Sequence, residues 1–499
     1  MAKAPADPDP TPYETIETDR GTTESPTEPV LEAELPGGRD AHDPYAAFRF
    51  PDFRRWLAGN VMAMAGGVML SVTLGYELQR RTNSATALGL VGLFQMIPVI
   101  SLSLVGGQVA DRVSRKRIIL TAQSIWIIVA TSLAFAALFH AQLPRAAPLL
   151  AANAALTRLA AFLGEKNAHF DDLHIPLVYL LLFIGGVVRA FNQPAKQSVL
   201  PLLVPPRVFS NAVTWNSSTF ELCSVAGPAV AGGLIAALQL ATRNPSPTAP
   251  PAPDSPWVFA TIYFLNAGLQ LGQFLMVLRI AIPQPPRAAE PPGLGSLLAG
   301  LRFVWTTKIL LATLSLDLFA VLLGGATALL PKFADEILAV GPVGFGLMRA
   351  APSVGALATA MAVAHLPPMR HAGRNLLVAV AGFGAATVVF GLSRNFPLSL
   401  AMLIVTGACD NISVIIRHTL VQLLTPDHMR GRVNAVNAVF IGSSNELGAL
   451  ESGLTAAMWG PRLSVAAGGL GTLAVVAAVG VLWPQVRTIK KLADAAPPK

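Results

Sequence analysis

Seven charged residues lie inside long apolar segments of this 499-residue chain, where a charge is costly unless it is paired or functional. They are Glu77, Arg189, Glu221, Asp317, Arg349, Asp410 and Glu446. Glu221 and Asp410 lie ~20 Å and ~21 Å along their segments, near mid-depth. Carboxyl groups in such surroundings can exchange protons near neutral pH, whereas the alternative is structural pairing with the arginines or with backbone groups. The predicted proton-coupling residues are Glu221, Asp410, Glu446 and Asp317.

Polar side chains form stripes on two of these segments. One stripe on 208–239 recurs at i, i+3, i+7 and i+10 and ends in Glu221, so its members share one face of a helix. A hydrogen-bonded seam between helices is the alternative for this stripe. A second stripe occupies one broad face of 429–458, and Arg349 lies at a depth similar to that of Glu446, with which it could pair. The residues predicted to contact a substrate are Asn211, Thr214, Ser218, Asn437, Asn445 and Arg349.

The composition indicates a polytopic helical membrane protein. The chain is 53% hydrophobic and 13% charged, with a mean hydropathy of +0.54, whereas a soluble protein carries about 25% charged residues. The net charge of +8 is no argument for nucleic-acid binding, because the cations lie at the ends of apolar segments. Cys223 and Cys409 both fall inside apolar segments, so we expect no disulfide.

Twelve apolar segments are long enough to cross a bilayer core of ~30 Å. They are 55–79, 85–107, 118–140, 176–194, 208–239, 257–280, 309–331, 341–366, 373–393, 396–422, 429–458 and 462–485. Most of the 36 Lys and Arg residues lie beside the ends that we assign to the cytoplasm, which predicts cytoplasmic termini. Glu77, beside Arg80 and Arg81 at an outer rim, is expected to be solvated.

The chain contains an internal repeat. Residues 89–98 match 343–352, and residues 197–205 match 418–426. The two segments of the first match are further apart in the sequence than those of the second match, by nearly the length of 141–175. We therefore predict that this stretch is an insertion on the outer side. Its weakly apolar part is expected to form an interfacial helix and not a thirteenth span.

The repeat divides the chain into two six-helix halves. The predicted parts are 1–52, a disordered acidic cytoplasmic tail; 53–280, the N-terminal half with the outer insertion 141–175; 281–308, a cytoplasmic linker; 309–487, the C-terminal half; and 488–499, a C-terminal tail.

A short basic turn lies between the segments 85–107 and 118–140. It reads Gly107-Gln-Val-Ala-Asp111-Arg112-Val-Ser-Arg115-Lys116-Arg117, and its last seven residues contain one acid and four cations. This turn resembles the signature loop between the second and third spans of the major facilitator superfamily of transporters, with Ser114 where the family usually has glycine. The resemblance implies an all-α membrane protein with twelve transmembrane helices in two six-helix pseudo-repeats.

We expect the loop to act on conformational switching. The residues assigned to this role are Gly107, Asp111, Arg112, Arg115 and Lys116. Asp111 is an isolated acid among cations, and we predict that it interacts with Arg430 and Arg432 or with the N-terminus of their helix.

Two further motifs are similar to those of the branch that includes the enterobactin exporter and macrolide-efflux-like proteins. They read Arg189-Ala-Phe-Asn-Gln-Pro-Ala-Lys-Gln and Leu423-Leu-Thr-Pro-Asp-His-Met-Arg-Gly-Arg-Val. Asn192 stands where that branch often has aspartate. The resemblance spans residues 53–487 and implies secondary active transport, with substrate bound between the halves near the midplane. The implied function is proton-coupled export of an amphipathic small molecule such as a siderophore, drug or metabolite.

The chain lacks the sequence motifs of several enzyme classes. No lysine follows a glycine, so a Walker A loop is absent, and neither H-E-x-x-H nor G-x-S-x-G occurs. We expect no enzyme, no cofactor and no metal. An importer or a lipid flippase on the same fold, or a non-transporting sensor or scaffold, are the alternatives. Expected partners are a small-molecule substrate, protons and membrane lipid but no nucleic acid, in a monomer located in a bacterial inner membrane.

Overall fold

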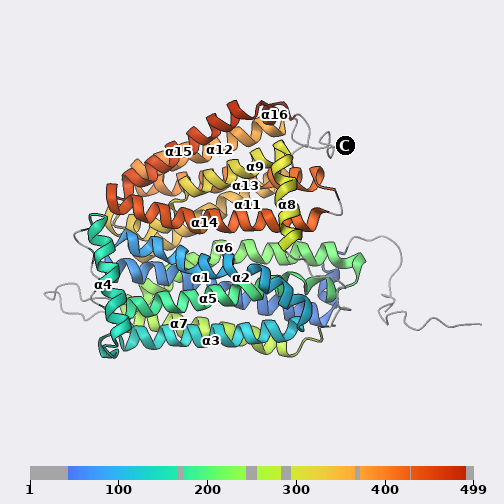
Figure 1. Cartoon of the computed structure of the whole chain (residues 1–499). Helices are drawn as coiled ribbons and strands as arrows, with labels where there is room; N and C mark the ends of the chain where they lie inside the picture. The colour runs from blue at the N-terminus through green and yellow to red at the C-terminus, as the bar shows by residue number, and fades with distance from the viewer. Residues whose placement is uncertain are drawn as a thin grey trace, which may run out of the picture. The chain divides into compact units, whose positions relative to one another are not determined.

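The computed structural model describes residues 43–165, 168, 170, 172–242, 255–282, 294–365, 371–426 and 429–489. Regular secondary structure in these residues is helical throughout (Figure 1). Outside them lie most of the predicted tail 1–52, residues 283–293 of the predicted linker 281–308, and the chain after residue 489. The last residues of the predicted tail form a 3-10 helix, η1 (Ala46–Arg49), and begin the first long helix.

Six long helices form the N-half. They are α1 (Pro51–Thr82), α2 (Ala85–Arg112), α3 (Arg115–Leu138), α5 (His174–Gln197), α6 (Pro206–Thr242) and α7 (Pro256–Leu278). Local signals set their ends: Asn83 closes α1 in the left-handed conformation, and the Ser84 side chain caps α2 by accepting from the Ala87 N–H at 3.1 Å. Within the half, α3 packs on α7 and α5, α2 packs on α5, and α1 packs on α7 and α6.

The C-half repeats this arrangement. Its helices are α9 (Lys308–Gly324), α11 (Gly341–His365), α12 (Ala372–Leu392), α13 (Phe396–Leu424), α14 (Arg430–Trp459) and α15 (Pro461–Leu482), followed by the short α16 (Pro484–Thr488). Here α11 packs on α13, α12 packs on α15 and α13, and α9 packs on α14 and α15. The two halves confirm the predicted all-α fold with two six-helix repeats.

One of the twelve long helices is unusually polar. Eleven helices of the described residues are long and apolar enough to cross a membrane. The twelfth, α14, is not among them because its polar and charged residues, including Glu446 and Glu451, lower its mean hydropathy. It nevertheless has 30 residues, ~45 Å of helix, and packs along α2 and α9. The polar helix is therefore held inside the bundle by its neighbours.

The predicted continuous span 309–331 is interrupted. The helix α9 ends at Gly324 and is followed by a 3-10 turn, η4 (Ala326–Leu329), the short α10 (Leu330–Lys332) and a π-helical turn, η5 (Phe333–Ile337). Consecutive glycines lower helix stability at this point. A Cβ on Gly324 would also lie 2.5 Å from a ring carbon of Phe383, so the close approach requires glycine.

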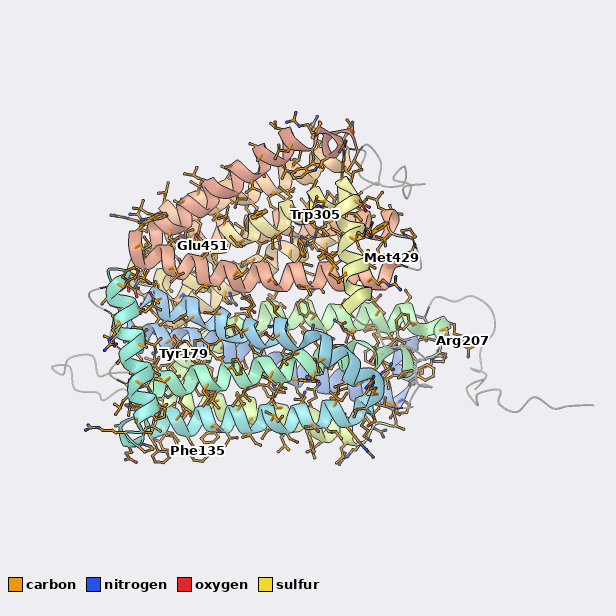
Figure 2. All side chains as sticks on the ribbon, in the orientation of Figure 1. Phe135, Tyr179, Arg207, Trp305, Met429 and Glu451 are labelled. Atoms are coloured by element: carbon orange, nitrogen blue, oxygen red, sulfur yellow. The ribbon has the colours of Figure 1, made fainter. Side chains whose placement is uncertain are left out.

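Two helices cross the others at opposite ends of the bundle (Figure 1). The insertion forms α4 (Ala147–Phe162), whose 16 residues reach only ~24 Å, and the linker forms α8 (Leu294–Thr306). In Figure 2, Tyr179 is labelled near α4, and Trp305 is labelled on α8 itself. We call these two sides of the bundle the α4 end and the α8 end.

The insertion is tied to the turn between α1 and α2. Glu165 accepts hydrogen bonds from the Ser84 hydroxyl at 2.5 Å and from the Ala85 N–H at 2.7 Å. Asp172 pairs with Arg81 at 2.8 Å. A carboxylate at the N-terminus of a helix satisfies free N–H groups and opposes the helix dipole, so Glu165 stabilises the start of α2.

Candidate functional site

The two halves touch backbone to backbone toward the α4 end. A Cβ placed on Gly89 of α2 would lie 2.9 Å from the Gly453 Cα of α14, and a Cβ placed on Gly232 of α6 would lie 2.9 Å from the Gly346 Cα of α11. Side chains do not tolerate such distances, so small residues are required on both sides. The halves are therefore closed at this end.

Polar side chains add a second layer to the closed end. Lys332 Nζ donates to the Asn83 carbonyl at 3.1 Å and lies 2.8 Å from Glu336 Oε1. Gln79 Nε2 donates to the same Glu336 oxygen at 3.0 Å. These contacts join the end of α1 to the segment that follows α9, so both polar and backbone contacts hold the halves together here.

The faces of α14 and α11 that contact the N-half toward the α4 end are exposed nearer the α8 end. Val439 lies two turns from Glu446 on one face of α14 and is 43% exposed. Leu357 lies three turns from Gly346 on one face of α11 and is 38% exposed. A Cβ on Gly107 of α2 would meet nothing within 4 Å. The facing sides of the halves therefore separate toward the α8 end.

Three charged residues meet where the close contact ends. Arg189 of α5 and Glu446 of α14 form an ion pair across the halves, with 3.4 Å between Nη1 and Oε1. The Glu446 carboxylate also packs against α2, since its Oε2 would lie 3.1 Å from a Cβ on Gly92. Arg349 of α11 is close enough to act electrostatically on Glu446. The ion-pair partner of Glu446 is thus Arg189, whereas Arg349, the partner considered from the sequence, lies within electrostatic range of Glu446 but forms no ion pair with it.

The α6 stripe lies on the face that meets the C-half. Glu221 is eleven residues, close to three turns, from Gly232 and therefore shares its direction. It is partly buried and has no hydrogen bond or ion pair with any described residue. Ser218 and Thr214, further toward the α8 end, are exposed. Helical periodicity alone positions these three side chains along the facing side of the N-half.

The other stripe residues are engaged in different ways. Asn211 accepts from the Ala47 N–H at 3.0 Å and donates to the Pro44 carbonyl at 2.7 Å, so it fastens η1 to α6. Asn437 is 4% exposed. Asn445 is exposed and donates to a carbonyl of its own helix at 3.0 Å.

A second acidic site lies inside the C-half. Asp317 of α9 forms a buried ion pair with Arg417 of α13. Asp317, Asp410 and Ser413 line one small cavity together with Cys409. On α13 the residues 410, 413 and 417 recur at i, i+3 and i+7, which explains why they share a face toward α9. The structure therefore brings the predicted Asp317 and Asp410 together.

Arg417 is a residue that the sequence analysis does not single out. It lies five residues before the end of the predicted span 396–422, where an arginine is normally an interfacial anchor. In the structure it is 2% exposed. The signal that could have found it is the helical spacing from Asp410, a motif that pairs a cation with an acid on one face.

The expectation that Glu77 is solvated is wrong. Its side chain is 1% exposed and accepts from Arg81 Nε at 2.8 Å and from the Tyr263 hydroxyl at 2.5 Å. His174 Nε2 lies 3.4 Å from its Oε1. His174 and Tyr263 come from α5 and α7, which are distant in sequence, so position at the end of a segment could not reveal the burial.

Two cations of the basic turn bind backbone carbonyls. Arg115 donates to the Ser198 carbonyl at 3.1 Å, just after α5. Lys116 donates to the Ile280 carbonyl at 2.7 Å, just after α7. Cations at these positions satisfy carbonyls left free at helix C-termini, so the start of α3 is held to the α8 ends of two neighbouring helices of the N-half.

The rest of the turn is open. Arg112 is exposed, and Gly107 has free space around its Cα. The side chain of Asp111 is outside the part of the chain that the structure describes, so its predicted contact with Arg430 or Arg432 stays a prediction.

Comparison with known protein families identifies the family of this chain. The family model of the Major Facilitator Superfamily matches residues 56–449. The chain belongs to the major facilitator superfamily. This confirms the predicted family, and the chain is a multi-pass membrane transporter and not an enzyme.

Relatives within the superfamily are exporters by name. The chain is 26% identical to the enterobactin exporter EntS of Shigella boydii serotype 18 (strain CDC 3083-94 / BS512) over 433 residues, which cover 85% of this chain and 90% of that protein. It is 27% identical over the same shares to the protein of the same name from Escherichia coli O9:H4 (strain HS). These matches confirm the predicted branch of the superfamily.

Solved structures share the fold. A bacterial homologue of the human lysosomal transporter Spinster, in an inward-facing and occupied conformation, has a TM-score of 0.61 at 13% identity and covers 90% of this chain and 100% of that chain. A bacterial homologue of the iron transporter ferroportin, in an inward-facing state, has a TM-score of 0.60 at 14% identity, with coverage of 88% and 99%.

Proposed function

We propose that this transporter exports a small amphipathic molecule from the cytoplasm by alternating access. The observation that carries the proposal is the asymmetry of the interface: the halves touch at Gly89 and Gly232 but expose the same helix faces toward the α8 end. A substrate would enter from the α8 end and bind near the charged cluster of Arg189, Arg349 and Glu446. The named exporters among the relatives support this direction.

The proposed orientation places the α8 end in the cytoplasm of a bacterial inner membrane. The basic turn, including Arg112, Arg115 and Lys116, lies at this end, and positive residues favour the cytoplasmic side. Both termini would then be cytoplasmic, and the insertion 141–175 with α4 would lie outside. The parts 53–280 and 309–487 would be the rocking halves, with 281–308 as their linker and 1–52 and 488–499 as tails.

We further propose that protons drive export. Glu221 supports this because it is an acid on the facing side with no partner among the described residues. Asp410 supports it because it lines a cavity beside the Asp317–Arg417 pair, which leaves Asp410 without a cation of its own there. Protonation would remove a costly charge from the protein interior in one conformation, and exposure in the other would release the proton.

The test is transport by purified protein in sealed vesicles of known orientation. Cationic, neutral and anionic fluorescent amphiphiles are screened first, with and without an imposed proton gradient. Asp410→Asn and Glu221→Gln should abolish accumulation against a gradient and retain downhill exchange. Asp52→Asn, a change at a half-buried acid at the α8 end that pairs with Arg55, serves as the control. Accumulation by both neutral variants would show that neither acid carries the proton.

A further inference from the structure

The charged cluster between the halves carries more positive than negative charge. Arg189, Arg349 and Glu446 come from α5, α11 and α14, so three helices and both halves contribute. The Arg189 guanidinium contacts the Glu446 carboxylate, and the Arg349 guanidinium is within electrostatic range of the same carboxylate. The side chain of Arg189 is 48% exposed and that of Glu446 is 23% exposed, so the cluster is open to a small molecule.

Most hydrogen-bond donors of the cluster are unused. A guanidinium carries five N–H donors in a planar fork that matches carboxylate, sulfonate and phosphate oxygens. Arg189 makes one contact of 3.4 Å with Glu446, close to the limit for a hydrogen bond. Arg349 has no hydrogen bond with any residue that the structure describes, although it is partly buried. Partly buried donors without acceptors indicate that an acceptor is to be supplied from outside.

Other acids of the bundle do not balance this charge. Glu221 is on α6, ~12 Å further toward the α8 end than Arg349, as judged from their spacing to the contacting Gly232 and Gly346. Glu451, shown in Figure 2, is more than one turn beyond Glu446 on α14 and is hydrogen-bonded to Ser452 at 3.4 Å. Asp317 is already paired inside the C-half.

We propose that the substrate is an anion whose carboxylate, sulfonate or phosphate group binds Arg349 and Arg189. This assignment rests on the proposed transport function and names its substrate class. Glu446 then acts as an internal stand-in that occupies Arg189 while the site is empty. The apolar part of the substrate lies along the facing side, where Val439 and Leu357 are exposed.

Binding of an anion has a consequence for the closed end. The Arg189–Glu446 pair is one of the contacts that join the halves. An anion on Arg189 competes with Glu446 and removes this contact at the inner edge of the glycine layer. Substrate binding thus weakens the closed end at the point where it must open for release.

The experiment compares two ligands that differ in charge alone. Naphthalene-2-sulfonate and uncharged naphthalene-2-sulfonamide are titrated into the purified full-length protein in a non-ionic detergent, and their dissociation constants are measured by calorimetry. The native protein should bind the sulfonate at least about tenfold more tightly. Arg349→Gln should remove this preference, while Arg158→Gln, at an exposed arginine of α4, should keep it.

The direction of the change in sulfonate affinity in Glu446→Gln tests the proposed competition. Loss of the competing carboxylate should tighten sulfonate binding several-fold, whereas a purely structural Glu446 would leave binding unchanged or weaken it. Equal affinity for the two ligands, no binding of the sulfonate, or unchanged or weaker binding in Glu446→Gln would each overturn the proposal. Vesicle transport that ignores substrate charge would refute the anion site but not export; charge-selective binding without any transport would refute export but not the site.

Discussion

Replacement of Gly89 by alanine should open the α4 end. The added Cβ would lie 2.9 Å from the Gly453 Cα and 3.0 Å from the Ala449 carbonyl oxygen, whereas ordinary contacts begin at 3.4 Å. The helices α2 and α14 must therefore move apart by about 0.5 Å in the closed state. Such overpacking costs about 1–3 kcal/mol. The cost is absent when the end is open, so the ratio of closed to open molecules should fall by about 5- to 150-fold.

Spin-label distances across the α4 end measure this shift. Labels are placed at Arg158 on α4 and at Arg394 between α12 and α13, both exposed, after replacement of Cys223 and Cys409 by alanine. Double electron–electron resonance should show a larger population at long distance in Gly89→Ala than in the parent protein.

The matched control is Gly233→Ala. This position is beside the contacting Gly232 on α6, yet a Cβ there would meet nothing within 4 Å. It therefore changes glycine to alanine in a long helix without a clash and should leave the distances unchanged. If Gly89→Ala gave the same distance distribution as Gly233→Ala, the glycine contact would not control closure of this end.

Three further predictions follow from other contacts. Arg417→Gln should lower the free energy of unfolding by about 3–5 kcal/mol, because it leaves Asp317 buried and unpaired. The double variant Arg417→Gln, Asp317→Asn should recover part of this loss in thermal unfolding. Equal losses in the single and the double variant would contradict a charge effect. Glu165→Gln should cost about 1 kcal/mol and speed amide exchange in the first turn of α2; unchanged exchange would argue against the cap. A cysteine at Arg158 should react with an impermeant maleimide added outside and one at Arg302 should not; the reverse pattern would invert the orientation.

The helices could be predicted because a bilayer imposes a length and an apolar composition on each span. The interruption after Gly324 was missed because an apolar count treats two consecutive glycines as compatible with a helix, although they weaken it and admit Phe383. A helix in the insertion was predicted from its weakly apolar stretch, and α4 is too short to span the bundle; its interfacial placement stays a prediction. Its hold on the α1–α2 turn through Glu165 depends on tertiary contacts that no local pattern records.

The positions of several candidate site residues could be predicted where helical periodicity decides them. The spacing from Thr214 to Glu221 is a property of one helix, and the depths of Arg349 and Glu446 follow from counting residues. Arg417 was not singled out and Glu77 was misjudged because both lie near the ends of apolar segments, where composition suggests water. Their burial depends on which helices cover those ends, and this is decided by packing between segments that are far apart in the chain.

The glycine contacts also determine how well the resting protein holds back ions. At the α4 end one layer of the barrier consists of backbone atoms from α2 and α14 and from α6 and α11, with no side chain between Gly89 and Gly453 that could swing aside. A hydrated ion needs a gap wider than these contacts leave, and local side-chain motion cannot provide it. Leakage of a gradient through an idle molecule is therefore limited by how often whole helices part, and each such parting is a step of the transport cycle itself.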